Sequence, residues 1–239
     1  MRVLSWNLYH GRATVPVRRP LLDEFASLLD RLEWDVALLQ EAPPRWFAEL
    51  ASRTRSSGVR VLTSRNWLPP LQARLADLNP HLIASWEGGS NQILVRHPGR
   101  IVEHRRLTLA YWPERRRMQW ARLDLPGFGR VCVANLHASA GSVRRAGAEV
   151  PRAAAAAVEW SADDPLVFGG DFNLRPAPQP EPFEQLRERF DLTAPTGPRA
   201  IDHLLARGLR VADPPRPLER EERELRLSDH APVVAAFVR

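Results

Sequence analysis

The sequence contains one cysteine, no lysine and no long apolar run. Cys132 cannot form a disulfide within the chain, and its place in the run VCVANL predicts a small buried apolar side chain. No uninterrupted apolar run approaches the roughly 20 residues that a membrane-spanning helix needs. The chain begins MRVLSWN, without a basic stretch followed by a long apolar one, so we expect a soluble protein of the cytoplasm.

The absence of lysine means that all 34 Lys and Arg positions are arginine, against 28 Asp and Glu, which gives a net charge of +6. Two interpretations of this composition remain open. Arginine forms bidentate pairs with phosphate, so a basic balance can indicate a nucleic-acid partner. An excess of arginine and alanine without lysine also fits a coding bias towards GC-rich codons.

Length and composition are those of an ordinary globular protein. The 239 residues are 44% hydrophobic and 26% charged, which is sufficient for a sizeable core. No Gly/Ser linker divides the chain, so we expect a single domain over residues 1–239. Since no amphipathic stretch is dedicated to self-association, we expect a monomer without a stable protein partner.

Short apolar runs alternate with stretches of helical period, which predicts an α/β protein whose sheets are covered by helices. Strands are predicted at 3–6, 36–39, 59–63, 92–96, 101–109, 117–125, 129–136 and 165–168. Helices are predicted at 21–32, 43–50 and 142–160, the last with a kink or restart at Pro151. The prolines of 176–182 predict a stiff extended loop, and 213–224 is predicted to be a polar loop with a solvated charge run.

Several predicted strands end in acidic, amide or imidazole side chains, in LSWN, LLQE, VANLH, VFGGDFN and LSDH. Such strand ends are where sheet-based enzymes gather their sites. In GGDFN the glycines allow a tight bend, and residues two apart on an extended chain face the same way, which directs Asp171 and Asn173 into one pocket. The same spacing places Asn135 and His137 together. The alternatives are an Asx turn at Asp171 and a surface imidazole at His137.

Glu41 ends a strand that is otherwise too apolar to hold an unpaired charge, so it lies at the mouth of the sheet or is neutralised by a cation. Together with Asn7, Asp171, Asn173 and Asp229 it forms a set of oxygen ligands, which favours a hard cation such as Mg²⁺ over zinc. With one Cys and no close His pair on a helix, a zinc site is not expected.

These sequence blocks resemble the endonuclease/exonuclease/phosphatase superfamily. The family's order is kept over nearly the whole chain, in LSWNLYHG, LLQEAP, GGSNQILVRHP, NLHASA, GGDFNLRP, AIDHLLA and LSDHAPV. The resemblance implies a four-layer α/β/β/α sandwich, with two mixed β-sheets packed face to face between outer helices. It also implies a site at one edge of the two sheets.

The resemblance further implies a role for each matching residue. Glu41 matches the principal metal ligand, beside Asn7 and Asp229. Asp171 matches the residue that orients or deprotonates the attacking water, and Asn173 matches the residue that positions this water and the phosphate.

On the substrate side, His230 matches the imidazole that holds the scissile phosphate, and Asp202 matches the carboxylate that pairs with it. His137 matches a histidine near the leaving oxygen. The expected phosphate contacts are Asn91, Asn135 and Arg117, with Arg116 as the alternative to Arg117 in the run ERRRMQW. His203, directly after Asp202, is expected to point elsewhere and to be structural.

The expected function is hydrolysis of a phosphodiester with Mg²⁺, for which Mn²⁺ is a possible substitute. A nuclease acting on DNA or RNA is favoured by the basic balance and His137, with Trp67, Trp86 and Trp112 available to stack on bases. The alternative is a phosphatase or phospholipase-like phosphodiesterase acting on a small or lipid phosphoester. A binding protein without activity is a third hypothesis, and the retention of the expected acids, amides and imidazoles argues against it.

Overall fold

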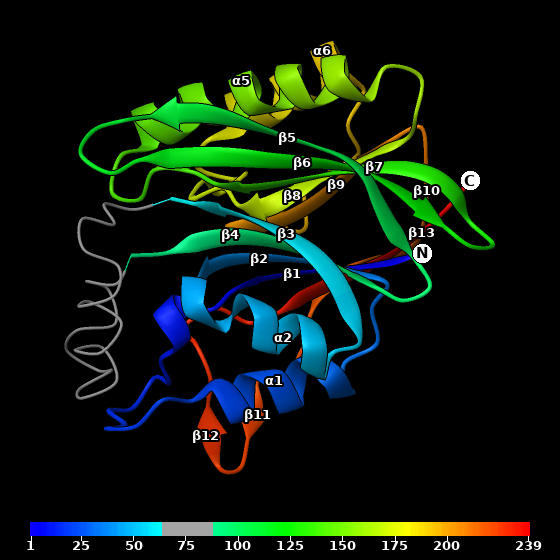
Figure 1. The fold of residues 1–239 in the computed structure, drawn as a ribbon. Helices are drawn as coiled ribbons and strands as arrows, with labels where there is room; N and C mark the ends of the chain where they lie inside the picture. Colours follow the sequence, from blue (N-terminus) through cyan, green and yellow to red (C-terminus); the bar gives the residue numbers. More distant parts are fainter. Residues whose placement is uncertain (64–87) are drawn as a thin grey trace.

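The fold consists of two large β-sheets between two layers of helices, and the computed structural model describes it for residues 1–63 and 88–239 (Figure 1). The six-stranded sheet has the order β10-β13-β1-β2-β4-β3. Its strands are β1 (Arg2–Asn7), β2 (Val36–Ala42), β3 (Ser56–Leu62), β4 (Ser90–Arg96), β10 (Arg210–Pro217) and β13 (Val233–Val238). Of its strand pairs, β1 and β2 are parallel and the others antiparallel, so the sheet is mixed.

The second sheet has five strands in the order β5-β6-β7-β8-β9. These are β5 (Arg100–Ala110), β6 (Arg116–Leu125), β7 (Gly129–His137), β8 (Leu166–Asp171) and β9 (Asp202–Arg207). This sheet is also mixed, because β7 and β8 run parallel. A small hairpin of β11 (Glu221–Glu222) and β12 (Leu225–Arg226) lies outside both sheets.

Helices cover the outer face of each sheet (Figure 1). On the six-stranded sheet these are α1 (Leu22–Arg31) and α2 (Phe47–Arg53), the latter preceded by the 3₁₀ turn η2 (Pro44–Trp46). On the five-stranded sheet they are α5 (Val143–Ser161) and α6 (Pro180–Phe190). One apolar cluster fills each helix–sheet interface and a third fills the space between the sheets. The expected four-layer α/β/β/α architecture is confirmed.

The structure corrects the sequence interpretation in three segments. Pro180 and Pro182 do not extend a loop but lie in the first turn of α6, where the missing proline N–H is tolerated. α5 continues through Pro151 without a restart. The segment 213–224 contains the end of β10 and the strand β11, and Glu222 is buried against Arg31 of α1 rather than solvated.

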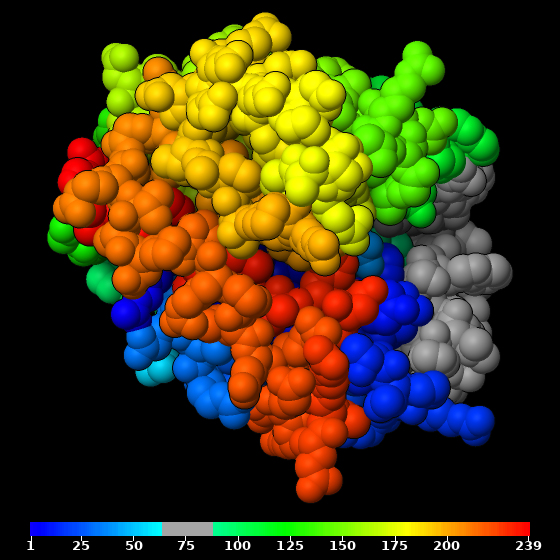
Figure 2. Space-filling view, turned by 180° about the vertical axis from the view of Figure 1, so that it is seen from behind, coloured from blue at the N-terminus to red at the C-terminus, as the bar shows by residue number. Residues whose placement is uncertain are grey.

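The layer between the sheets changes from apolar to polar along the strands. Val36, Val133 and Val167 are buried in its apolar part. Polar residues follow further along these strands. Gln40 of β2 pairs with Asn7 of β1. Asp171 of β8 pairs with His137 of β7 on one side and with Asp202 of β9 on the other. Segments from the two ends of the chain meet here, since β1 pairs with β13, and their blue and red atoms lie side by side in Figure 2. The polar strand ends therefore converge at one edge of the sandwich.

Candidate active site

Asp171 lies at the centre of the polar edge, at the end of β8. The positive φ of Gly170 (129°) and its close approach to β7 explain why glycine precedes it, since a Cβ there would lie 1.9 Å from the carbonyl oxygen of Leu136. Oδ2 of Asp171 accepts a hydrogen bond from Nδ2 of Asn7 at 3.0 Å, and Oδ1 accepts one from the backbone N–H of Asn173 at 2.9 Å. The Asx turn that we considered as an alternative is thus present, and it holds Asp171 within the cluster.

The environment of Asp171 makes its ionisation unusual. Burial raises the pKa of Asp171 to about 7, assisted by the neighbouring charge of Asp202 and opposed by His230 and by the hydrogen bond from Asn7. A carboxylate with a pKa near neutrality is well suited to accept a proton from water.

His230 forms a tight pair with Asp202. Its Nδ1 lies 2.8 Å from Oδ2 of Asp202, while its Nε2 lies 3.8 Å from Oδ2 of Asp171 and 3.9 Å from Oδ1 of Asp229. Burial opposes the charge on the ring, but the hydrogen bond and charge of Asp202, with the charges of Asp171 and Asp229, raise the pKa of His230 to about 9. The ring is therefore a cation that presents its Nε2–H to the cluster.

The segment 228–230 is fixed to β1 by two hydrogen bonds that the sequence analysis did not anticipate. The buried hydroxyl of Ser228 donates to the backbone oxygen of Asn7 at 2.7 Å, and the indole of Trp6 donates to the backbone oxygen of His230 at 2.9 Å. Asp229 remains half-exposed at the rim. These bonds hold His230 and Asp229 beside Asn7.

Glu41 approaches the cluster from β2, at an irregularity in its pairing with β4 and with a positive φ of 47°. Its Oε2 lies 3.1 Å from Nε2 of His10, and its Oε1 lies 3.6 Å from Nε2 of His137. His10, which the sequence analysis missed, is mostly buried, and burial lowers the pKa of its ring. The carboxylate of Glu41 therefore lies between two imidazoles.

His137 joins Glu41 to Asp171, since its Nε2 also lies 3.6 Å from Oδ2 of Asp171. Nη1 of Arg116 lies 3.0 Å from Nδ1 and 3.1 Å from Nε2 of His137. Burial, the charge of Arg116 and the nearby His230 and His10 hold the pKa of His137 well below its usual value. His137 is thus a buried, neutral ring rather than a surface imidazole.

The structure places Arg116, not Arg117, against this histidine. The guanidinium of Arg117 instead donates to the backbone oxygen of Leu62 at 3.3 Å and to the hydroxyl of Thr108 at 3.4 Å. Adjacent residues on a strand point to opposite faces, so only one of the two arginines reaches the cluster.

Asn91 and Asn135, which we expected to contact phosphate, are instead fully buried between the sheets. The side-chain carbonyl of Asn135 accepts from Gln40 at 2.8 Å, and its amide donates to the backbone oxygens of Leu39 and Gln92 at 2.9 Å each. The amide of Asn91 donates to the backbone oxygen of Arg117 at 2.9 Å. Both amides thus link the two sheets in this structure, and the phosphate contacts expected of Asn91 and Asn135 stay predictions.

The remaining predicted positions fall into three groups. Asn173 lies at the cluster, and its Nδ2 donates to the backbone oxygen of Ala138 at 3.1 Å. His203 is buried away from the cluster, where its Nε2 lies 3.2 Å from the backbone oxygen of Leu174, as expected for a structural residue. Trp67 and Trp86 lie outside the described residues.

The cluster also has the chemistry to hold a metal ion. Among the described residues, Asp171, Asp202 and His230 bring potential ligand atoms within 4.8 Å of one another, and with the ring of His230 protonated the two carboxylates are the ones that offer lone pairs. Oδ1 of Asp202 is buried without a hydrogen-bond partner in the described part of the chain. Several buried carboxylate oxygens so close together favour a bound cation, because its positive charge offsets the cost of their desolvation.

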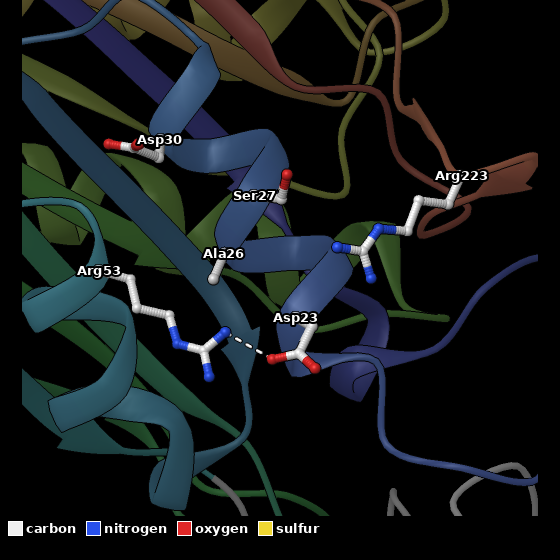
Figure 3. Close-up of a pocket in the computed structure, with 6 residues that line it drawn as sticks. All are labelled: Asp23, Ala26, Ser27, Asp30, Arg53 and Arg223. Carbon is white, nitrogen blue, oxygen red and sulfur yellow. Dashed lines mark hydrogen bonds and ion pairs between the residues drawn. The ribbon is translucent and has the colours of Figure 1, made fainter.

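Away from the cluster, a hollow lies on the outer layer formed by α1, α2 and the β11–β12 hairpin (Figure 3). Its volume is about 260 Å³, and it is lined by Asp23, Ala26, Ser27, Asp30, Arg53 and Arg223. Arg53 pairs with Asp23 at 2.5 Å, and Arg223 lies 3.8 Å from Glu24. These are paired surface charges on a helix layer, so we assign the chemistry to the sheet edge and not to this hollow.

A comparison with family models shows the family of the chain. The model of the endonuclease/exonuclease/phosphatase family matches residues 4–230. The chain belongs to this family. Members of the endonuclease/exonuclease/phosphatase family are metal-dependent hydrolases that act on phosphoester bonds, so the cluster at the sheet edge lies in a phosphoesterase.

Solved structures show the same fold at low sequence identity. The mannosyl-6-phosphatase of Bacteroides thetaiotaomicron is 17% identical with a TM-score of 0.75, and 100% of each chain is covered. An endonuclease/exonuclease/phosphatase of Beutenbergia cavernae is 22% identical with a TM-score of 0.73, covering 99% of this chain and 71% of that one. The human Nocturnin catalytic domain with bound sulfate is 18% identical with a TM-score of 0.70, covering 99% and 93%.

Two further comparisons concern curated proteins and membrane-spanning helices. No match was found among curated proteins. Within residues 1–63 and 88–239, the helices are too short or too polar to cross a bilayer.

Proposed function

We propose that this member of the family hydrolyses phosphodiesters with Mg²⁺, using Asp171 to activate water and His230 to hold the phosphate. The observation that carries the proposal is the juxtaposition of Asp171 with His230 in one buried cluster, at 3.8 Å between Oδ2 and Nε2. One group has the character of a base and the other that of a cationic acid. This combination suits in-line attack of water on a phosphorus atom.

Asp171 is held in a fixed orientation for proton transfer. The hydrogen bonds from Asn7 and from the backbone of Asn173 occupy one site on each carboxylate oxygen, which fixes the plane of the carboxylate. A remaining lone pair accepts the proton of the attacking water, and the side chain of Asn173 helps to position that water. Precise placement matters, because orientation of the nucleophile supplies much of the rate acceleration.

His230, Arg116 and His137 act on the phosphate. Charge grows on the phosphoryl and leaving oxygens in the transition state, and fixed donors stabilise it there. The protonated ring of His230, supported by Asp202, donates through Nε2 to a phosphoryl oxygen. Arg116 takes the role expected of Arg117, and the neutral ring of His137 beside it lies near the leaving oxygen.

Glu41, Asn7 and Asp229 are the residues that would hold Mg²⁺, or Mn²⁺ in its place. Their donors are oxygen atoms, which a hard cation prefers. The carboxylates and imidazoles form one connected cluster, through His137 between Glu41 and Asp171 and through His230 between Asp171 and Asp229. When bound, the ion neutralises charge on the phosphate and lowers the pKa of water.

The favoured substrate is DNA or RNA. Tyr111 and Trp112 are 80% and 72% exposed in the turn between β5 and β6, a few positions before Arg116, which contacts His137. Exposed aromatic rings beside a cationic phosphate site can stack on bases. The similarity to a mannosyl-6-phosphatase supports a second candidate, a small sugar phosphate.

The test is a substrate panel with purified protein. A single-stranded oligonucleotide, a plasmid, a chromogenic phosphodiester and mannose 6-phosphate are each incubated with Mg²⁺, Mn²⁺ or chelator, with Asp171→Asn as the inactive control. Metal-dependent cleavage of nucleic acid supports the nuclease. If only mannose 6-phosphate is hydrolysed, the second candidate is correct. If no phosphoester is cut with either metal, the proposed function is wrong.

A further inference from the structure

We infer that His10 is a positioning residue, which holds the Glu41 carboxylate so that one of its oxygens faces the metal ion. This inference rests on the proposed function, in which Glu41 is a metal ligand. No expectation drawn from the sequence gave His10 a role, although it lies in the block LSWNLYHG.

The backbone turn that carries His10 has contacts of its own besides the one with Glu41. His10 lies in the 3₁₀ turn η1 (Tyr9–Gly11) directly after β1, and Tyr9, His10 and Gly11 all have positive φ values, of 50°, 54° and 76°. The backbone N–H of Leu8, just before the turn, donates to the carbonyl oxygen of Gln40 at 2.8 Å. The turn is therefore tied to the residue that precedes Glu41.

Packing fixes the turn from its other side. A Cβ on Gly11 would lie 2.3 Å from the ring of Trp46, so only glycine allows the turn to pack against that ring. On the far side, a Cβ on Gly89 would lie 3.2 Å from Cα of Glu41 and 3.5 Å from Cε1 of His10. The turn that carries His10 therefore packs against Trp46, and the imidazole itself lies close to Gly89.

The two carboxylate oxygens of Glu41 face different histidines. Oε2 lies 3.1 Å from Nε2 of His10, and Oε1 lies 3.6 Å from Nε2 of His137, which in turn contacts Asp171. Nδ1 of His10 is buried and has no hydrogen-bond partner among residues 1–63 and 88–239. The N–H of the ring is consequently best placed on Nε2, which faces Oε2 of Glu41 as an ion-pair contact at 3.1 Å.

This arrangement is that of an outer partner of a metal ligand. Hydrogen bonds to ligating carboxylates orient them, and removal of the partner typically weakens metal binding by about 10–100-fold. A histidine with a purely structural role would contribute to the stability of the fold. Its replacement would then leave the metal affinity of the folded protein unchanged.

The experiment compares His10→Leu with His10→Gln. Leucine fills the space without a donor, whereas the amide of glutamine is able to place an N–H near the position of Nε2. Mn²⁺ binding is measured by titration calorimetry on metal-free protein, and Tm is measured in chelator. We expect His10→Leu to weaken Mn²⁺ binding by about tenfold or more and His10→Gln to restore most of the affinity.

The controls separate the inference from the function on which it depends. If wild type binds no Mn²⁺, or if Glu41→Gln binds it as tightly as wild type, the metal site in the proposed function is wrong. If Glu41→Gln loses binding but folded His10→Leu binds like wild type, the inference about His10 is wrong. If His10→Leu does not fold, His10→Asn replaces it, because its shorter amide cannot reach Glu41. Equal Mn²⁺ affinity of His10→Asn and His10→Gln would overturn the inference.

Discussion

The imidazole of His230 lies 2.8 Å from the carboxylate of Asp202, across 28 positions of the chain, and this contact keeps the ring charged beside Asp171. Because the protonated ring is the form that donates to phosphate, activity should persist until the pH exceeds the raised pKa of His230, about 9. In Asp202→Asn the ring loses its charged partner and its pKa falls. The alkaline limb of the pH–kcat profile should then move to lower pH by about 1–3 pH units.

The exposed Asp163 provides the matched control for this change. Asp163→Asn changes the net charge by the same amount at a residue outside the cluster. It should leave the pH–kcat profile unchanged. An alkaline limb that is identical in wild type and Asp202→Asn would mean that His230 is not the group whose protonation limits turnover.

Replacement of Asp171 by asparagine should separate catalysis from stability. Loss of the base should lower kcat by about 10²–10⁴-fold. Burial raises the pKa of Asp171 from 3.8 to about 7, so the folded chain binds this proton more tightly than the unfolded chain does. Ionisation of Asp171 therefore lowers the free energy of unfolding as the pH rises from about 4 to about 7.

Asparagine carries no buried charge, so in chelator at pH 8 the Asp171→Asn variant should unfold at a Tm equal to or above that of wild type. Thermal unfolding monitored by circular dichroism makes this measurement. A large drop in Tm would show that the carboxylate stabilises the fold, and the loss of activity would then no longer identify a base.

The two neighbouring arginines should behave differently. Arg116 contacts His137, whereas Arg117 donates to Leu62 and Thr108 away from the cluster. Removal of a fixed donor to the transition state typically lowers kcat by about 10²–10³-fold, and we expect Arg116→Ala to fall in that range. Arg117→Ala should change kcat little. Steady-state kinetics on a chromogenic phosphodiester decide between them, and equal losses would contradict the assignment of Arg116.

The aromatic rim should matter only for substrates with bases. If Tyr111 and Trp112 stack on nucleobases, their replacement by alanine should weaken binding by about 1–3 kcal/mol per stacked base. KM should therefore rise on an ordinary single-stranded oligonucleotide and stay unchanged on one whose sugars carry no bases.

Val102→Ala, at a half-exposed apolar position on β5, is the control for general surface effects. A rise in KM of the same size on both oligonucleotides would show that the turn contacts the sugar–phosphate backbone instead.

Strand periodicity predicted which side chains share a face of the sheet, but not how far each lies from the polar edge. Asn135 and His137 do point to the same side of β7, as their spacing requires, yet only His137 lies at the polar edge. Asn135 is one repeat further inside, where its amide bonds both sheets. The sequence gives the direction of each side chain, whereas the distance from the sheet edge depends on how far the neighbouring strands extend.

His10 and Arg116 were missed or left ambiguous because their positions depend on irregular backbone. His10 has a positive φ in a short turn, and Arg116 lies at the start of β6, where the pairing with β5 shifts register. Periodic patterns carry no information on such positions. By contrast, Asp171 ends the strand β8, and Glu41 and His230 lie in sequence blocks whose resemblance to those of the family singled them out despite the irregular backbone at Glu41.

The pairing of β1 with β13 affects when the site can assemble during synthesis of the chain. Asn7 leaves the ribosome 221 positions before Ser228, whose hydroxyl bonds the backbone oxygen of Asn7. A nascent chain that lacks residues 228–238 has neither the cationic histidine nor the strand that flanks β1. Hydrolytic capacity should therefore arise abruptly, once residues 228–238 have been released and have joined β1.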